Sequence, residues 1–334
     1  MNTPGTDHLA RSRRNQFTAV RLNRETELRD DAQWVSKTLL DTRTRLVPLW
    51  RSRSLLERTS DGTVAIYLSP DELEQPDRIQ PPTLLGNDGK REYFAVSVTD
   101  QQKDAILAKL AQAQFADLRR ASIDMAAKHA GILAYAKALH YWQHRHAFCG
   151  VCGNPNLLRS AGHRMVCSNE ECARETYPRI DPAIIVLITN KDACLLGRNT
   201  KWRSKHFSTL AGFVEPGESL EDAVVREVYE EVQLHLEDIH YVSSQPWPFP
   251  ASAMCGFYAE AVDRNAGTSD EVEETRWFTV DTLTQAVTDN EVRLSPPVSI
   301  AFRLLADWFR KNGGGSLEKL VRQQQSVNVP VSTC

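Results

Sequence analysis

The chain has 334 residues, of which 41% are hydrophobic and 25% are charged, and its formal net charge is −3 with a pI near 6.3. This composition is ordinary for a soluble globular protein, and the length is enough for about two domains. This near-neutral charge gives no electrostatic argument for binding nucleic acid or an anionic membrane surface. The longest apolar run, residues 183–188, is far shorter than the roughly 20 residues of a membrane span, so no membrane partner is expected.

The first part of the chain predicts a small α+β domain. Residues 63–68 and 93–98 are apolar runs bounded by turn residues, which is typical of β-strands. Apolar residues recur at helical spacing over residues 104–146 and predict two helices with a break near Gly131. No apolar segment follows the arginines of residues 1–30, so this start is expected to be a flexible tail and not a secretory signal.

Four of the seven cysteines form two close pairs, Cys149 with Cys152 and Cys167 with Cys172. Two such pairs on tight turns can bring four thiolates together around Zn²⁺. The odd cysteine count and the lack of an export signal argue against a disulfide framework and indicate a reducing, cytoplasmic location. We therefore expect a structural zinc ribbon over residues 146–178. An iron–sulfur cluster or redox pairs are the alternatives, and a ribbon of this kind can also bind nucleic acid.

The second half of the chain alternates apolar runs with turns. Strands are expected over residues 183–189, 193–196, 255–262 and 275–279, and helices over residues 219–232 and 297–310.

The acidic helix expected over residues 219–232 carries the strongest chemical signal. Ser219 is a candidate N-cap, with Asp222 placed three residues later as in a capping box. Glu227, Glu230 and Glu231 are spaced i, i+3 and i+4, so their carboxylates lie on one face of the helix. Mg²⁺ or Mn²⁺ would relieve the repulsion among them and would also bind the phosphate oxygens of a substrate. A solvated acidic face is the alternative that the three glutamates alone leave open.

Residues 212–234 as a whole resemble the signature of Nudix hydrolases, Gly-x5-Glu-x7-Arg-Glu-hydrophobic-x-Glu-Glu-x-Gly-hydrophobic. The residues that match in register are Gly212, Glu218, Arg226, Glu227, Val228, Glu230, Glu231 and Leu234. The signature's second glycine, which favours a left-handed helix end, is replaced by Gln233 at a cost of about 1 kcal/mol. The resemblance implies an α/β/α sandwich with a mixed sheet over residues 179–315, followed by a C-terminal tail over residues 316–334.

The resemblance also assigns roles to the matching residues. Glu227, Glu230 and Glu231 would hold divalent metals, with Glu231 slightly favoured as general base. Arg226 would orient the glutamates through a salt bridge, and Glu218 would help to hold the loop against the helix. The implied reaction is the attack of water on a phosphorus of a nucleoside diphosphate that is linked to another group.

Further motifs resemble the NADH pyrophosphatase branch of this family, which is NudC-type. Residues 244–252 read Ser-Gln-Pro-Trp-Pro-Phe-Pro-Ala-Ser, as in that branch, and the three prolines are expected to exclude a regular strand or helix. A hydrophobic loop packed on its own domain is the alternative that composition alone favours. The branch also carries a four-cysteine ribbon, a Tyr-Pro dipeptide as at Tyr177, and a Ser-Ile-Ala helix as at Ser299. It implies an NADH-pyrophosphatase-like α+β domain over residues 1–145.

The branch implies a substrate pocket and one further metal ligand. Phe213 and Tyr177 would stack on a base, and Gln245 and Trp247 would complete the pocket from the partner subunit of a homodimer. Ala211 is expected in the same pocket. Glu271 would be the additional metal ligand, and its neighbours Glu273 and Glu274 are the alternatives.

The implied activity is hydrolysis of NADH or NAD⁺ to AMP and NMNH or NMN, and the resemblance also allows removal of the NAD cap from RNA 5′ ends. Another nucleoside diphosphate, such as ADP-ribose, is the alternative substrate. A non-catalytic regulator that senses a nucleotide with a zinc ribbon and a Nudix fold is the alternative of a different class. The near-neutral net charge gives no support for a large RNA footprint.

Overall fold

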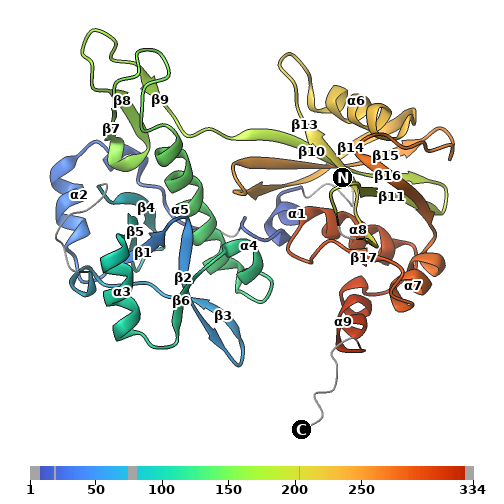
Figure 1. Ribbon diagram of the computed structural model, residues 1–334, viewed down its shortest axis with the longest axis horizontal. Coiled ribbons are helices and arrows are strands. Elements are labelled where there is room, and N and C mark those ends of the chain that lie inside the picture. Colours follow the sequence, from blue (N-terminus) through green and yellow to red (C-terminus); the bar gives the residue numbers. More distant parts are fainter. Residues whose placement is uncertain (1–7, 19, 74–80, 203, 328–334) are drawn as a thin grey trace, which may run out of the picture. The chain divides into compact units, whose positions relative to one another are not determined.

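The computed structural model describes residues 8–18, 20–73, 81–202 and 204–327, which form two compact units (Figure 1). The C-terminal unit consists of the described parts of Met1–Asn15, Asp181–Gln245 and Ala253–Cys334, and the N-terminal unit consists of those of Gln16–Ile180 and Pro246–Ser252. Across the described residues, every helix is too short or too polar to cross a membrane.

The N-terminal unit is built on a six-stranded sheet with the order β3-β2-β1-β5-β4, in which β6 also pairs with β2. The sheet is mixed, because β1 and β5 are parallel whereas the other paired neighbours are antiparallel. Its elements are β1 (Arg45–Trp50), β2 (Arg53–Thr59), β3 (Gly62–Ala65), β4 (Thr83–Asn87), β5 (Glu92–Ser97), β6 (Ala113–Ala116), α2 (Ala32–Leu39), α3 (Asp100–Lys109), α4 (Leu118–Ala121) and α5 (Ala127–Arg145).

The segment over residues 104–146 differs from the expected pair of helices. The helical pattern is interrupted by β6, which pairs with β2 and buries Phe115 opposite Leu55. Helix α5 then continues through Gly131, so the break expected there is wrong. Gly131 lies in a buried stretch of α5 packed against the sheet, and this packing compensates for the low helix propensity of glycine.

The cysteine-rich segment forms a three-stranded sheet within the N-terminal unit: β7 (Asn156–Arg159), β8 (Arg164–Cys167) and β9 (Glu175–Thr176). Two buried side chains tie it to the larger sheet. His163 Nε2 lies 2.6 Å from the carbonyl oxygen of Leu84, and Gln143 donates to the carbonyl of Gly162 at 2.8 Å. The ribbon is therefore anchored by polar contacts that water does not reach.

The C-terminal unit has a second six-stranded sheet, with the order β14-β15-β10-β11-β16 and with β13 paired to β10. Its main elements are β10 (Asp181–Asn190), β11 (Ala193–Asn199), β13 (Leu210–Phe213), α6 (Leu220–Val232), β14 (Leu236–Trp247), β15 (Ser252–Ala261), β16 (Val272–Phe278), α7 (Val280–Thr288) and α8 (Ile300–Lys311). A short sheet pairs β12 (His206–Phe207) with β17 (Arg293–Leu294).

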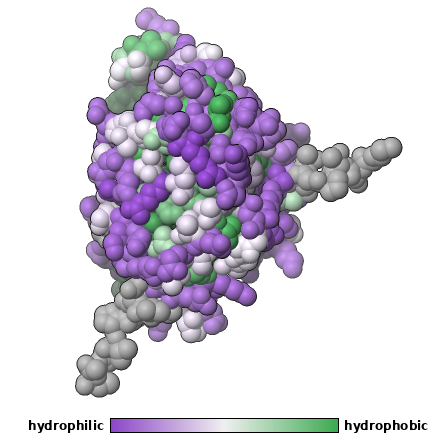
Figure 2. All heavy atoms as spheres, turned by 90° about the vertical axis from the view of Figure 1, so that its right-hand side faces the viewer, coloured by the Kyte–Doolittle hydropathy of each residue, from purple (hydrophilic) through white to green (hydrophobic). Residues whose placement is uncertain are grey.

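Strand β10 separates the two cores of this unit. Ile184 and Val186 face the cluster that contains α6, whereas Ile185 and Leu187 face the cluster that contains α7 and α8. The helices therefore cover opposite faces of one sheet (Figure 1), and the predicted α/β/α sandwich and α+β class are confirmed. The face of this unit drawn in Figure 2 is mostly hydrophilic, with apolar side chains in small separate groups.

Strand β14 was not predicted, and it extends to Trp247 through Pro246. The expectation that the prolines exclude a strand is therefore wrong for residues 244–247. Strand β14 lies at the edge of its sheet, and an edge position tolerates a residue that has no N–H to donate.

Both ends of the described chain form helices that belong to the C-terminal unit. Helix α1 (His8–Arg14) lies where the sequence predicted a flexible start, and His8 Nδ1 is 3.1 Å from the carbonyl oxygen of Val242. Helix α9 (Leu317–Val327) lies within the predicted tail and buries Leu317 and Val321 in the core of this unit. Residues 1–7 and 328–334 of the two predicted tails lie outside the described residues.

Candidate functional site

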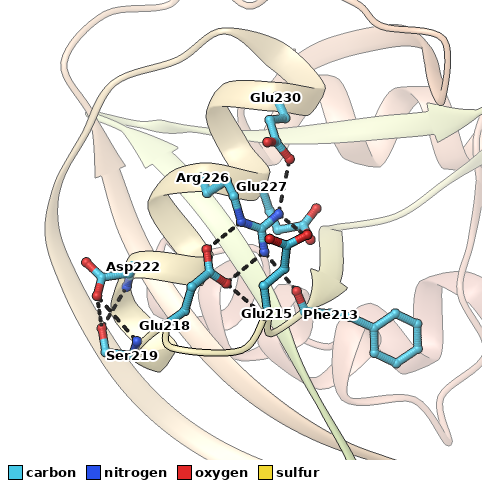
Figure 3. Close-up of polar contacts among 8 residues, drawn as sticks. All are labelled: Phe213, Glu215, Glu218, Ser219, Asp222, Arg226, Glu227 and Glu230. Carbon is cyan, nitrogen blue, oxygen red and sulfur yellow. Dashed lines mark hydrogen bonds and ion pairs between the residues drawn. The ribbon is translucent and has the colours of Figure 1, made fainter.

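The helix α6 begins as the sequence predicts. Ser219 is its N-cap, and the Ser219 hydroxyl accepts a hydrogen bond of 3.0 Å from the backbone N–H of Asp222 (Figure 3). The Asp222 carboxylate accepts in return from the Ser219 backbone at 3.3 Å, so the capping box is confirmed. The apolar face of α6, which includes Ala223, Val224 and Val228, is fully buried. This packing fixes where the acidic side chains of the helix point.

Gly212 in β13 stands where the acidic helix approaches the sheet most closely. A Cβ atom at this position would overlap the carboxylate of Glu227, so only glycine leaves room for that side chain. Ala211 and Phe213 alternate with Gly212 along the strand and are both exposed. The strand thus admits Glu227 on one face and presents the Phe213 ring to solvent on the other.

Arg226 is the centre of the polar network (Figure 3). Its guanidinium group binds both oxygens of Glu218, at 2.5 and 2.9 Å, and also donates to Glu227 at 3.0 Å and to Glu230 at 3.1 Å. A further bond of 2.9 Å reaches the carbonyl oxygen of Phe213. The hydrogen bond from Arg226 is the main reason why the pKa of Glu218 is lowered to about 2. Arg226 therefore connects the loop, the strand and two of the helix glutamates, as the resemblance implied.

Glu231 carries the most perturbed carboxyl group of the site. Burial, and then the charges of Glu227, Glu271 and Glu230, raise the pKa of Glu231 to about 8. Its Oε2 atom is buried and makes no hydrogen bond to any part of the chain that the structure describes. A buried carboxylate oxygen without a partner is costly, and a divalent cation is a partner that would also relieve the repulsion from the other glutamates. The donor set fits Mg²⁺ or Mn²⁺.

The loop before β16 offers Glu271 to the same cluster. Its two neighbours are already engaged, because Glu273 pairs with Arg198 and Glu274 binds the same arginine at 3.1 Å. Glu271 itself makes no ion pair with the described residues, and its backbone oxygen accepts from Thr200 at 2.9 Å. Sequence reasoning missed Arg198, because its role depends on the strand register that sets it opposite Glu274.

The glutamates are more widely spaced than the ligands of a closed metal cage. Among the described residues, the cysteine cluster is the group of metal-binding side chains whose ligand atoms all lie within 4.8 Å of one another. Mg²⁺ usually keeps several water ligands and binds through one or two carboxylates together with substrate phosphates. The spacing of the glutamates therefore leaves room for water and for a phosphorylated ligand.

The raised pKa of Glu231 predicts how stability depends on pH in the metal-free protein. A carboxyl group whose pKa is raised by folding stabilises the fold at low pH, and this contribution is lost as the pH rises from about 4.5 through about 8. We expect the thermal unfolding midpoint without added Mg²⁺ or Mn²⁺ to fall by several degrees between pH 5 and pH 8.5, and added Mg²⁺ to reverse the fall. In Glu231→Gln the midpoint should depend less on pH; an equal dependence would contradict the assignment.

The end of α6 confirms the expected geometry at Gln233. This residue has φ 57° and ψ 26°, in the left-handed region that favours glycine. Among the described residues, its side chain makes one long hydrogen bond, of 3.4 Å, to the carbonyl oxygen of Glu230.

Replacing Gln233 with glycine should therefore stabilise the protein. We expect Gln233→Gly to raise the free energy of unfolding by about 1 kcal/mol, because glycine adopts the left-handed conformation without strain. Urea denaturation provides the measurement. Gln233→Ala keeps the strain and serves as the control, so an equal gain in both variants would count against the backbone explanation.

The structure places Gln245 and Tyr177 in different settings. Gln245 is 1% exposed, and its amide group donates to the carbonyl of Val298 at 2.7 Å and accepts from the N–H of Ile300 at 2.8 Å. These bonds hold the start of α8, so the amide is engaged in the fold. Tyr177 is 61% exposed, and its hydroxyl donates to Glu175 at 2.7 Å. Its ring is open to a ligand.

Trp247 packs in the aromatic core of the N-terminal unit. Its ring meets those of Phe17 and Phe249 edge to face, with centroids 5.9 and 5.1 Å away. The guanidinium group of Arg119 lies 5.3 Å from the Trp247 ring. Within this chain, the aromatic rings of the proline-rich segment therefore pack against one another and against Phe17.

The four cysteines converge. The sulfur atoms of Cys149 and Cys172 are 3.8 Å apart, and those of Cys152 and Cys167 are 3.3 Å apart. Thiolates bound tetrahedrally at about 2.3 Å from Zn²⁺ are separated by about 3.8 Å. Backbone N–H groups donate hydrogen bonds to the sulfur atoms of Cys149 and Cys152. The hydrogen bond from the backbone N–H of Asn154 is the main reason why the pKa of Cys152 is lowered to about 6. The cluster can hold a metal ion.

Two family models match parts of this chain. Residues 179–296 match the family described as "NUDIX domain", and residues 43–142 match "NADH pyrophosphatase-like rudimentary NUDIX domain". A solved NUDIX hydrolase from Nitrosomonas europaea aligns with a TM-score of 0.37 at 20% identity, covering 54% of this chain and 90% of that one.

Curated relatives share a large part of this sequence. The chain is 37% identical over 204 residues to the NAD-capped RNA hydrolase NUDT12 of Macaca fascicularis, covering 58% of this chain and 44% of that protein. It is 45% identical over 153 residues to the NAD-capped RNA hydrolase NudC of Pseudomonas fluorescens, covering 46% and 55%. The chain spans about half the length of the curated relatives it matches. Residues 179–296 thus match a NUDIX domain, and residues 43–142 match a rudimentary NUDIX domain of the NADH pyrophosphatase type.

Proposed function

We propose that this protein hydrolyses the pyrophosphate bond of NADH and NAD⁺, giving AMP and NMNH or NMN, and that it removes the NAD cap from RNA 5′ ends. The observation that carries the proposal is the complete acidic site, in which Arg226 fixes Glu218 and Glu227 beside the buried, unpartnered carboxylate of Glu231. The names of the relatives, NAD-capped RNA hydrolases in each case, support the substrate.

The acidic residues have distinct roles in this proposal. Glu227, Glu230, Glu231 and Glu271 hold Mg²⁺ or Mn²⁺, which would neutralise charge on the phosphates and make the attacking water more acidic. Arg226 and Glu218 are positioning residues, because they fix the helix against the strand that carries Phe213. Glu231 is the proposed acceptor of a proton from water, because its carboxyl group is buried next to the other glutamates of the site.

The remaining assignments complete the proposal. Cys149, Cys152, Cys167 and Cys172 hold a structural Zn²⁺, and the reduced thiols that this requires favour a cytoplasmic location. The exposed rings of Phe213 and Tyr177 stack on the dinucleotide beside Ala211. Trp247 completes the pocket from the partner subunit of a homodimer, and Gln245, whose buried amide holds the start of α8, positions this segment.

A product assay tests the function. The protein is incubated with NADH, NAD⁺, ADP-ribose or an NAD-capped RNA in Mg²⁺ or Mn²⁺, and the nucleotides are separated. We expect AMP with NMNH or NMN, and a 5′-monophosphate RNA. A strong preference for ADP-ribose would replace the substrate assignment, and no turnover with any of the four would favour the nucleotide-sensing regulator. Sedimentation analysis tests the homodimer, since a monomer at assay concentration would remove the partner-subunit roles.

A further inference from the structure

A group of basic side chains lies on the C-terminal unit away from the acidic residues described above. Helix α1 has three arginines in its last turns, and the last turn of α8 adds two more cations. We call these five residues the basic patch: Arg11, Arg13, Arg14, Arg310 and Lys311. The two helices lie side by side (Figure 1).

Asp307 and Tyr258 show that the patch is one continuous surface. The Asp307 carboxylate binds Arg14 at 2.6 Å and Arg310 at 3.0 Å, so one acid joins the two helices. The Nζ atom of Lys311 lies 5.4 Å from the centroid of the Tyr258 ring. Burial raises the pKa of Tyr258, and the charges of Arg11, Arg14 and Arg310 oppose this rise, which places all three near its hydroxyl group.

The charge of this surface is opposite to that of the whole chain. Two adjacent helix ends carry five cations, two of which share the Asp307 carboxylate, whereas the whole chain carries a net charge of −3. One or two cations at a helix end are explained by the helix dipole. Five cations on two adjacent helix ends go beyond that explanation, because like charges brought together repel one another unless an anion binds.

The chemistry of the patch fits a chain of phosphates. Arg13, Arg14 and Arg310 are exposed, and arginine presents a planar fork of donors that matches phosphate oxygens. A membrane surface would also require an apolar face, but Leu9 is the only large apolar side chain exposed on α1. A single-stranded nucleic acid needs only closely spaced cations along its backbone.

We propose that the basic patch binds the phosphate backbone of the RNA whose 5′ cap enters the acidic site. This inference rests on the proposed function for its substrate, and it concerns binding of the RNA body and not the chemical step. The near-neutral net charge conceals the patch, because the opposite charges are segregated on different surfaces of the unit.

The experiment compares a patch variant with a matched control. The variant R11Q/R13Q/R310Q/K311Q keeps the Arg14–Asp307 ion pair that anchors α1. The control R43Q/R51Q/R58Q/K90Q removes four exposed cations from the N-terminal unit. Each protein is assayed for NADH hydrolysis, for hydrolysis of an NAD-capped RNA, and for affinity for the same RNA without a cap, by fluorescence anisotropy at several salt concentrations.

We expect kcat/KM for NADH to be unchanged in both variants. The patch variant should lose about tenfold or more in RNA affinity and in kcat/KM for capped RNA, and its log–log salt slope should fall by up to about 3, since each lost phosphate contact removes about 0.7. The control should stay near the native protein. Equal losses in both variants, or native RNA affinity in the patch variant, would overturn the inference.

Two further results distinguish RNA binding by the patch from the enzyme activity and from membrane binding. If the native protein hydrolyses neither NADH nor capped RNA, the proposed function fails, whereas the anisotropy comparison still decides whether the patch binds RNA. Vesicles that contain phosphatidylserine test the other anionic partner. Loss of vesicle binding in the patch variant with RNA affinity unchanged would assign the patch to a membrane surface and overturn the proposal.

Discussion

Glu231→Gln is expected to lower kcat for NADH hydrolysis by about 10³-fold while the protein remains folded. The substitution keeps the size of the side chain but removes the charge that would bind a divalent cation and accept a proton, and proton transfer alone contributes about 10²–10⁴-fold in enzymes. Steady-state kinetics in saturating Mg²⁺ provides the measurement. Unchanged turnover would remove Glu231 from the mechanism and favour the sensor over the enzyme.

Stability measurements separate a chemical defect from a folding defect. In the native protein the buried Oε2 atom of Glu231 has no hydrogen-bond partner among the described residues, and the carboxyl group faces the charges of Glu227 and Glu271. The neutral amide of the E231Q variant avoids this repulsion, so above about pH 8 metal-free E231Q should unfold at a higher temperature than metal-free native protein. Its stabilisation by Mg²⁺ should be smaller. Glu221→Gln is the control, because Glu221 is an exposed carboxylate of the same helix, and it should retain native turnover.

The acidic helix could be predicted from sequence because its structure is decided locally. Ser219 and Asp222 form the cap, the spacing of Val224 and Val228 selects the buried face, and the helix repeat then fixes where the glutamates point. The left-handed end at Gln233 is also local, since it follows from the position where the helix stops. The sequence therefore predicted these features in detail.

The features that were missed depend on contacts between distant parts of the chain. Residues around Phe115 form strand β6 instead of the expected helix, because they pair with strand β2, which lies far away in the sequence. Residues 8–14 form α1 because His8 and Arg14 reach Val242 and Asp307. No local pattern contains this information, so the helices at the two ends of the chain and the basic patch became visible only in the folded structure.

Cys172→Ser is expected to remove the zinc ion and to destabilise the N-terminal unit by several kcal/mol. Structural Zn²⁺ in small ribbons contributes on the order of 10 kcal/mol of folding free energy, and a serine hydroxyl is a poor substitute for a thiolate ligand. The effect should spread beyond the ribbon, because His163 and Gln143 bind backbone groups that connect it to the larger sheet. Loss of the ribbon would leave the Leu84 carbonyl without His163 and would remove Gly162 from the Gln143 amide.

Elemental analysis gives the zinc content per chain and thermal unfolding gives the change in stability. Cys255→Ser is the matched control. Cys255 is a half-buried thiol of the other unit and lies outside the cluster, so its variant should keep about one zinc ion per chain and a near-native unfolding midpoint. Iron in place of zinc in the purified native protein would show that the four thiolates hold an iron–sulfur cluster. A native protein that contains no metal and whose stability does not respond to chelators would exclude a metal site at these cysteines. A closed set of four thiolates leaves no coordination position for a substrate, so we expect the zinc to stabilise the fold and to take no part in the chemistry at Glu231.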